Sequence, residues 1–192
     1  MVKYSFFDVI RNGLSFMFTR IFFPKARLIR LPLFRSGPKF CYKKGLTMGR
    51  GCRIDVGSGR YSLTIGKDAR IGDYVHINAE KEVVIGDNVL MASKIFISDA
   101  SHGSYSGDIQ DLPNTIPSLR ELVVKPVKIG DNVWIGENVV ILQGTIVGDG
   151  CIIGANSVLN GKEYPNNSII VGAPAKVIKK FNPNTNVWEK LL

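Results

Sequence analysis

Two histidines, His76 and His102, are the side chains of this sequence best suited to move a proton near neutral pH. An imidazole has a pKa near ~6.5, so it can accept the proton of a hydroxyl group and turn that oxygen into a nucleophile. His102 lies in the segment SDASHGSYSG, which begins immediately after Ile97. A proton acceptor and a solvated loop residue are the two interpretations of His102. For His76, which ends the segment IGDYVH, we favour a surface imidazole.

The same composition argues against a metal centre. Two histidines cannot form a His-rich metal site, and the three cysteines, Cys41, Cys52 and Cys151, contain no CxxC spacing. Reduced thiols in the cytoplasm are the simplest interpretation of such cysteines. We therefore expect a cytoplasmic protein that requires no metal.

The elements that position these residues follow from a six-residue period. The units IGDNVW, IGENVV, ILQGTI, VGDGCI and IGANSV follow one another from Ile129, and the period also runs from Ile65 to Ile77 and from Ile85 to Ile97. An aliphatic residue opens each unit, and a small or β-branched residue takes its fifth place. Because a unit this short cannot bury an apolar face alone, the units must stack into one continuous core. The period predicts a solenoid.

The details of the period predict the shape of the coil. Asp, Asn and Gly cluster in the second to fourth positions, as in Gly130-Asp131-Asn132, where a sharp corner needs residues that tolerate left-handed backbone angles. The phase slips by two residues near Val83, and the rhythm disappears between Ile97 and Ile129. This second interruption predicts a loop that leaves the coil and carries His102.

Positive charge is concentrated at the N-terminus. Residues 1–53 carry a net charge of +11 and the remainder −2, which together give the net charge of +9. Apolar residues from Phe6 to Ile21 recur at helical spacing, and Pro24 then stops the predicted helix. The charges at Asp8, Arg11 and Arg20 leave no run of the ~20 apolar residues that cross a bilayer, and they also interrupt a signal-peptide core.

Two interpretations of this N-terminal segment stay open. It is either a basic amphipathic helix on an anionic membrane face or a cap whose apolar face covers the open end of the solenoid. In the first case, the basic groups that reach lipid phosphates are Lys25, Arg27, Arg30 and Arg35. The second is slightly favoured, because capping is obligatory. No module typical of nucleic-acid binding occurs, so we do not expect a nucleic-acid partner.

The run IGDNVWIGENVVILQGTIVGDGCIIGANSVL, followed by Pro165 and IIVGAPAKVIKK, resembles the hexapeptide-repeat acyltransferases over residues 46–180. It is most similar to the maltose, galactoside and Nod-factor acetyltransferases and to the bacterial polysaccharide O-acetyltransferases. The resemblance implies an all-β fold, a left-handed parallel β-helix with three hexapeptides per coil, assembled as a homotrimer with active sites between subunits. Acetyl-CoA is the usual donor, and no metal is required.

The charge pattern, the six-residue period and the extent of the resemblance together predict a domain organisation. Residues 1–45 form the basic amphipathic capping segment, residues 46–180 the β-helix domain with a protruding loop near 98–127, and residues 181–192 a C-terminal tail.

The site residues are carried over one at a time. His102 matches the histidine that relatives place on a loop in the cleft, which favours the catalytic interpretation. Asp99 can orient its ring, but a turn-forming Asp is at least as good an explanation. Asn78 in HIN matches an acceptor-binding asparagine, and Trp134 in NVWIG matches a tryptophan beside the acceptor or the pantetheine arm. We expect Trp134 to lie close to His102 along the stack.

For acetyl-CoA, the resemblance implies contacts in the C-terminal repeats. Glu137 lies where a relative's backbone meets the pantetheine chain, and Ala155 where a small residue lets that chain pass. Asn160 and Lys162 fall near a Thr-Lys pair of the family, although NGKEYP is one residue longer than the usual turn. Two lysines of APAKVIKK, Lys176 and Lys179, match basic residues that face the nucleotide phosphates.

Departures from the small-sugar enzymes guide the choice of acceptor. Those enzymes open with an acidic helical region, whereas FFPKARLIRLPLFRSG resembles the openings of polysaccharide and lipid-linked oligosaccharide O-acetyltransferases. We therefore expect O-acetylation of a surface saccharide or its precursor, in the cytoplasm or peripherally at the inner membrane. The alternative is an O- or N-acetyltransferase for a free sugar, an antibiotic or an amino acid. A γ-type carbonic anhydrase is excluded, because it needs three histidines on zinc, and a non-catalytic scaffold gives no reason for SHGSY.

Overall fold

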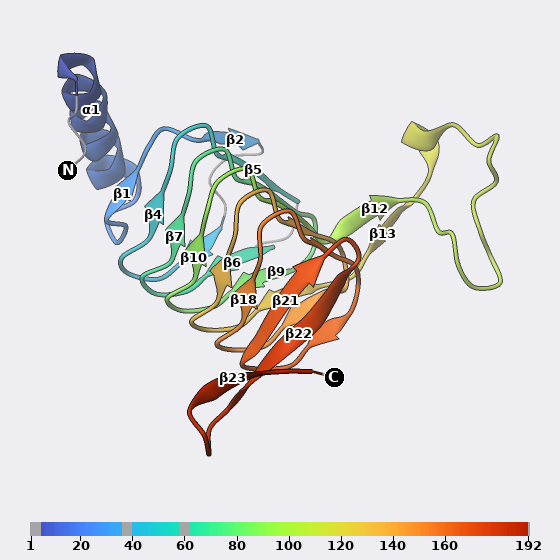
Figure 1. The fold of residues 1–192 in the computed structure, drawn as a ribbon. Coiled ribbons are helices and arrows are strands. Elements are labelled where there is room, and N and C mark those ends of the chain that lie inside the picture. The colour runs from blue at the N-terminus through green and yellow to red at the C-terminus, as the bar shows by residue number, and fades with distance from the viewer. Residues whose placement is uncertain (1–4, 36–39, 58–61, 192) are drawn as a thin grey trace.

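A computed structural model describes residues 5–35, 40–57 and 62–191, with the Arg35 side chain outside the described part. The chain winds into a parallel β-helix of three sheets, and each turn adds one strand to each sheet (Figure 1). Sheet A holds β1 (Leu28–Ile29), β4 (Thr47–Met48), β7 (Arg70–Ile71), β10 (Leu90–Met91), β15 (Trp134–Ile135), β18 (Ile152–Ile153) and β21 (Ser168–Gly172). The predicted all-β coil is thus confirmed.

The other two sheets have six strands each. Sheet B holds β2 (Leu33–Arg35), β5 (Arg53–Val56), β8 (His76–Ala79), β11 (Phe96–Ser98), β16 (Val140–Ile141) and β19 (Val158–Leu159). Sheet C holds β3 (Cys41–Tyr42), β6 (Leu63–Ile65), β9 (Val83–Ile85), β14 (Val127–Ile129), β17 (Ile146–Val147) and β20 (Glu163–Tyr164). At the C-terminal edge, β22 (Ala175–Asn182) and β23 (Val187–Lys190) extend sheet A as antiparallel strands.

The core lies inside the coil and follows the six-residue period. The opening residues of the five best repeats are at most 2% exposed: Ile129, Ile135, Ile141, Val147 and Ile153. The fifth-place residues are also buried: Val133, Val139, Thr145, Cys151 and Ser157. Because both positions of each unit point inward, stacking is what buries them, as the period predicts.

The corners use the residues expected of them. Asn132 and Asn138 both have φ 57°, and Gly150 has φ 65°. Asn adopts this left-handed region more readily than most residues, and Gly at no steric cost. At the corner between sheets C and A, Oδ1 of Asp131 accepts a hydrogen bond from the Asp87 backbone N at 2.6 Å, and Oδ1 of Asp149 accepts one from Asp131 N at 2.7 Å. A ladder of side-chain oxygens thus joins successive corners.

The phase slip near Val83 corresponds to a corner that a buried carboxylate stabilises. Between β8 and β9, the corner Glu80-Lys81-Glu82 is turned around the carboxylate of Asp99, which is fully buried. Its two oxygens accept the backbone N–H groups of all three corner residues at 2.7–2.8 Å. The slip is therefore a longer corner held from the following turn.

The interruption after Ile97 becomes a projecting hairpin. Strands β12 (Ala100–His102) and β13 (Leu122–Val124) pair antiparallel, and the loop between them includes the short helix η1 (Pro117–Leu119). Figure 1 shows this loop standing away from the coil. It leaves after β11 of sheet B and rejoins at β14 of sheet C, so it emerges from the corner between those sheets. The predicted protruding loop is confirmed.

The N-terminal segment divides into a helix and a first turn of coil. Helix α1 (Phe6–Phe22) has a Ser5/Asp8 capping box and ends before Pro24, as predicted. Strand β1 already pairs with β4, β2 with β5 and β3 with β6, so these three strands belong to a first turn of coil inside the segment expected to cap it. Among the described residues, no helix is both long and apolar enough to cross a membrane.

The open end of the coil is closed by aromatic rings that follow α1. The ring of Phe23 lies 5.6 Å from that of Phe34, 6.0 Å from Phe40 and 5.8 Å from Tyr42. Phe23 is 3% exposed, whereas most apolar side chains of α1 itself are exposed. Capping therefore comes mainly from this cluster, to which α1 adds the half-buried Phe18, whose ring lies 5.8 Å from that of Phe23.

Candidate active site

A cleft of about 460 Å³ lies where sheet B meets the hairpin. Its lining comes from β5, β8 and β11 on one side and from the paired strands β12 and β13 on the other. The lining residues are Arg53, Asp55, Val56, His76, Asn78, Glu80, Phe96, His102 and Leu122. The structure thus brings together His102 and Asn78, two of the residues that the sequence singled out.

The hairpin positions His102 through its backbone. His102 is the last residue of β12 and pairs with Leu122. Its carbonyl oxygen accepts a hydrogen bond from the Tyr105 hydroxyl at 2.6 Å, and that hydroxyl accepts one from Arg120 Nη1 at 2.7 Å. The residue itself is exposed. Since the backbone is fixed while the side chain stays accessible, the imidazole can meet a ligand in the cleft.

The glycine that follows His102 is favoured by its backbone conformation. Gly103 has φ 90°, and a Cβ atom there would lie 2.8 Å from the Tyr105 hydroxyl and 3.0 Å from both Arg120 Cδ and Asp111 Oδ2. Its N–H donates to the Glu121 carbonyl at 2.8 Å. The chain therefore reverses directly beside His102 at a backbone angle that glycine adopts without strain.

Asn78 reaches the cleft because of the alternation along β8. Ile77 and Ala79 are fully buried, so His76 and Asn78 point to the outer face. The Nδ2 atom of Asn78 donates to Ser98 Oγ at 3.2 Å, and Ser98 Oγ also contacts the Ala100 backbone at the base of the hairpin. This chain of contacts links the coil side of the cleft to the hairpin that carries His102.

Sequence reasoning missed a charged cluster in the same cleft. His76 Nε2 lies 3.0 Å from Oδ2 of Asp55, and Arg53 Nη2 lies 2.6 Å from the same oxygen. The His76 ring also contacts Phe96, with centroids 5.1 Å apart. Burial alone raises the pKa of the Asp55 carboxyl, but the hydrogen bonds and charges of Arg53 and His76 outweigh it and hold that pKa below its ordinary value.

His76 is therefore a half-buried member of the site, rather than the plain surface imidazole that we favoured. The register places Arg53 opposite His76 and Asp55 opposite Asn78. That register could have been found by counting one turn back from β8, but the segment between β5 and β8 does not keep the six-residue period throughout.

Asp99 contacts the preceding turn of the coil through its carboxylate. Both of its carboxylate oxygens accept backbone N–H groups from residues 80–82, so the group is directed to the preceding turn. Of the two interpretations of Asp99, the structure fits the turn-forming one.

Trp134 lies on a different face from the cleft. It belongs to sheet A, where it pairs with Leu90 and Ile152, and it is 52% exposed. It does not line the cleft on sheet B. Trp134 does lie in the turn that follows the hairpin, and so close to His102 along the stack, but within one chain the two residues are on different sides because consecutive repeats occupy different sheets.

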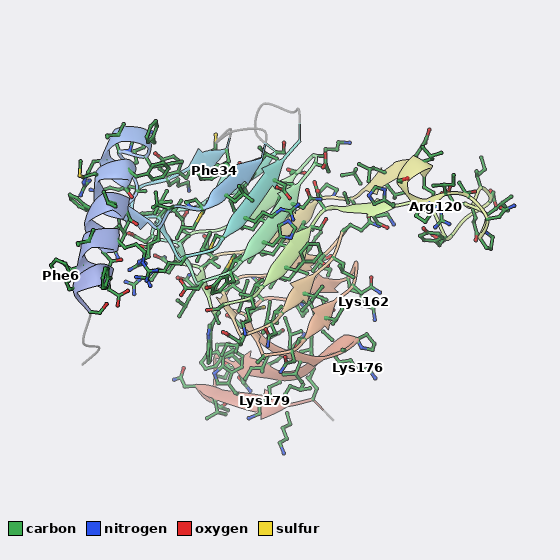
Figure 2. All side chains as sticks on the ribbon, turned by 90° about the horizontal axis from the view of Figure 1, so that it is seen from above. Phe6, Phe34, Arg120, Lys162, Lys176 and Lys179 are labelled. Atoms are coloured by element: carbon green, nitrogen blue, oxygen red, sulfur yellow. The ribbon has the colours of Figure 1, made fainter. Side chains whose placement is uncertain are left out.

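The residues carried over for acetyl-CoA lie in the C-terminal turns. Glu137 and Ala155 occupy successive corners between sheets A and B, and Glu137 Oε2 accepts the Ser93 N–H at 2.8 Å. Asn160 and Lys162 lie at the corner between sheets B and C, two turns beyond the hairpin. Lys176 and Lys179 are on β22. Figure 2 shows Lys162 and Lys176 on the side of the molecule from which the hairpin projects.

The buried cysteines do not line the cleft. Cys52 and Cys151 are buried in the coil, and burial raises the pKa of the Cys52 thiol to about 11. In the part of the chain that the structure describes, no three His, Cys, Asp or Glu side chains gather as a metal site would require.

Comparisons with known proteins identify the class. The family model "Bacterial transferase hexapeptide (six repeats)" matches residues 126–161. The chain is 41% identical over 190 residues to WbbJ of Escherichia coli (strain K12), whose name assigns it O-acetyl transfer in lipopolysaccharide biosynthesis; the match covers 98% of this chain and 96% of WbbJ. The chain therefore belongs to the hexapeptide-repeat acyltransferases.

Solved structures agree with this class. A maltose O-acetyltransferase from Clostridium difficile 630 superposes with a TM-score of 0.61 at 28% identity, covering 90% of this chain and 87% of that one. The hexapeptide-repeat acetyltransferase VCA0836 from Vibrio cholerae O1 biovar eltor, complexed with acetyl-coenzyme A, gives a TM-score of 0.55 at 27% identity, with 88% and 78% covered.

Proposed function

We propose that this chain transfers the acetyl group of acetyl-CoA to a hydroxyl of a bacterial surface polysaccharide or of a lipid-linked saccharide precursor. The observation that carries the proposal is the shared cleft of His102 and Asn78. Similarity to WbbJ over nearly the whole chain supports a saccharide acceptor. The cleft is lined by charged, polar and aromatic side chains, a mixture that suits a sugar with hydroxyl groups and an apolar ring face.

In the proposed mechanism His102 is the general base. The acceptor hydroxyl gives its proton to the imidazole while its oxygen bonds to the thioester carbonyl carbon. The resulting tetrahedral intermediate collapses with cleavage of the carbon–sulfur bond, and the imidazolium returns the proton to the departing CoA sulfur. Asn78, fixed through Ser98, holds the acceptor hydroxyl towards His102. A backbone N–H is a suitable donor to the developing oxyanion.

Acetyl-CoA is the proposed donor, bound along the C-terminal turns. Glu137 and Ala155 border the pantetheine arm, Asn160 and Lys162 lie further along it, and Lys176 and Lys179 meet the phosphates as point charges. The acetyl-coenzyme A complex of VCA0836 supports this choice. The chemistry requires no metal, since the thioester is already activated.

A homotrimer is part of the proposal. Trp134 lies on sheet A and the His102 cleft on sheet B, so a tryptophan can border the acceptor only if a neighbouring subunit brings its sheet A to that cleft. The exposed apolar side chains of Trp134 and Leu90 on sheet A, 52% and 47% exposed, support such a contact. Peripheral contact with the inner membrane is likewise proposed.

The test is mass spectrometry of candidate saccharides incubated with acetyl-CoA and either wild type or His102→Ala. We expect a gain of one acetyl group with wild type and a rate lower by about 10² to 10⁴ with the variant, as for loss of a general base. His102→Gln is the matched control, because it keeps a polar side chain of similar reach without a titratable ring. Equal transfer by His102→Ala would remove His102 as the base.

A free sugar is the alternative acceptor. Similarity to a maltose O-acetyltransferase favours it. The two candidates separate in the same assay: acetylation of maltose or galactosides at a rate above that of oligosaccharides from surface polysaccharides would support the alternative.

A further inference from the structure

A second, strongly basic cavity lies at the base of α1, on elements that do not line the catalytic cleft. Its volume is about 750 Å³. It is lined by Arg20, Pro24, Lys25, Ala26, Arg27, Lys44, Gly45, Lys67 and Asp68. Five of these side chains are basic and one is acidic, and Arg27 and Lys67 lie 3.3 Å and 3.9 Å from Asp68. The cavity therefore keeps a large excess of positive charge that suits an anion.

Three lysines of the cavity occupy one position of the coil. Lys25, Lys44 and Lys67 each stand three residues before a strand of sheet A, in the first, second and third turns. Their carbonyl oxygens accept equivalent bonds, from Gly45 N to Lys25 O and from Asp68 N to Lys44 O, both at 2.9 Å. Neighbouring turns are about 4.8 Å apart. Three lysines thus occupy equivalent corner positions in three successive turns, at close spacing.

The same corner has the opposite character in the later turns. There the equivalent residues are Asp87, Asp131, Asp149 and Asn166. An oxygen of each accepts the N–H of the equivalent residue one turn earlier, at 2.6–2.9 Å. A lysine cannot accept such a bond, so Lys44 and Lys67 leave out a contact that the later corners make and add repulsion between like charges. An anion in the cavity would offset both.

The neighbouring helix is turned the opposite way from an ordinary surface helix. Its buried residues are Ser15 and Thr19, and Thr19 Oγ1 accepts the N–H of Ile29 at 2.8 Å. Except for Phe18, which packs against the core, its large apolar side chains point away from the coil: Phe6, Phe7, Ile10, Leu14, Met17 and Ile21 are 74%, 79%, 47%, 56%, 61% and 68% exposed. Figure 2 shows α1 at one edge of the molecule, with Phe6 at its outer end. This surface needs an apolar partner.

We propose that the basic cavity binds the phosphate of anionic lipid headgroups while the exposed apolar face of α1 enters the bilayer. The cavity and the helix meet at Arg20, which is in the last turn of α1 and lines the cavity. Phosphate charge beside apolar chains is the chemistry of an anionic lipid surface, and lysines bind phosphate as point charges without a fixed geometry. The charge complementarity of the cavity selects this partner for the helix. The proposal does not depend on the reaction catalysed in the cleft.

The test is co-sedimentation of the full chain with vesicles. One triple variant, Lys25→Gln/Lys44→Gln/Lys67→Gln, removes the lysine corner; its matched control, Lys94→Gln/Lys180→Gln/Lys190→Gln, removes the same charge from exposed positions elsewhere. On phosphatidylglycerol-containing vesicles we expect a loss in partitioning on the order of a hundredfold for the first variant and a much smaller one for the control. Equal losses would mean that net charge alone acts, and the cavity would be discarded as a site.

Inorganic phosphate separates a lipid headgroup from a free anion. If the cavity binds lipid headgroups, millimolar phosphate should reduce vesicle binding by wild type no more than chloride of equal ionic strength does. Saturable thermal stabilisation by phosphate, lost in the lysine variant and accompanied by no preference for anionic vesicles, would overturn the lipid assignment in favour of a free phosphate ligand.

A second variant tests the helix. Phe7→Ser/Leu14→Ser/Ile21→Ser alters three side chains that are seven residues apart on one face of α1, and none of them is buried. We expect it to lose vesicle binding and to keep the sedimentation coefficient of wild type in analytical ultracentrifugation. A change of assembly state would instead make α1 a contact between copies of this chain and would contradict the proposal.

Discussion

The two sides of the cleft are built in different ways. On the coil side, β8 is paired in register with β5 below and β11 above, so His76 and Asn78 are held by ladders on both edges of their strand. On the hairpin side, His102 ends a strand with a single partner, β13, and depends on the side chains of Tyr105 and Arg120. The difference implies that stability is concentrated in the coil, whereas the proposed general base is on a less supported element.

Asp99 is where the two sides meet, and we expect its loss to have the largest effect. Its carboxylate holds the corner at residues 80–82, and its backbone oxygen accepts the Lys125 N–H at 2.9 Å where the hairpin rejoins the coil. Asp99→Ala leaves three backbone donors without an acceptor in a buried place, so the free energy of unfolding should fall by about 3 to 5 kcal/mol. Chemical denaturation measures it.

The matched control for Asp99→Ala is Asp108→Ala, at an exposed position of the hairpin loop, which should change stability by about 0.5 kcal/mol or less. Asp99→Asn should lie between the two, because one oxygen acceptor remains. If Asp99→Asn kept full stability and only moved the pH profile of acetyl transfer, Asp99 would act on the His102 ring after all.

The sequence predicted the core and corners of the coil better than the contacts in the wall of the cleft or the direction of the helix. A fixed period determines which residues face inward, so the burial of Ile135 and Val139 and the corner at Asn132 could be inferred without coordinates. The loss of the period was enough to predict the projecting loop and the place of His102 in it.

What could not be predicted depends on register between distant residues. The contact of His76 with Asp55 joins strands one turn apart, and its detection requires the length of every corner between them. The outward direction of the apolar residues of α1 was also hidden, because helical spacing shows that a face exists and not which way it points. The separation of Trp134 from the cleft within one chain was hidden for a third reason, since proximity along the stack does not fix the sheet.

Arg120 tests the support of the hairpin, with an intermediate effect. Its guanidinium donates to the Tyr105 hydroxyl at 2.7 Å and to the Thr115 carbonyl at 2.8 Å, and so ties the loop to the carbonyl of His102. In Arg120→Ala the imidazole should lose its fixed approach, and kcat/KM should fall about tenfold. The unfolding midpoint should change little, because the coil is untouched.

Tyr105→Phe is the conservative partner of that change. It keeps the ring under the Arg120 guanidinium, 5.7 Å from its centroid, but removes the hydrogen bond to the His102 carbonyl. We expect a two- to threefold loss in kcat/KM, smaller than for Arg120→Ala, from the cost of about one neutral hydrogen bond in an exposed place. A large drop in the unfolding midpoint of either variant would show that the hairpin supports the coil, against the division of roles described above.

The smallest effect is expected on the coil side, from the titration of Asp55. Arg53 and His76 hold the pKa of this carboxyl below its ordinary value, so the folded state binds a proton there less readily than the unfolded chain does. The stabilisation is therefore fully present above the unfolded pKa of about 3.9 and is lost as the pH falls through the lower folded value. At pH 7, Asp55→Asn should lower the free energy of unfolding by about 0.5 kcal/mol, and this difference from wild type should shrink steadily below about pH 4. Urea denaturation at a series of pH values measures it; a difference that stayed constant down to pH 2 would mean that packing, and not the charge of Asp55, holds His76 in the wall of the cleft.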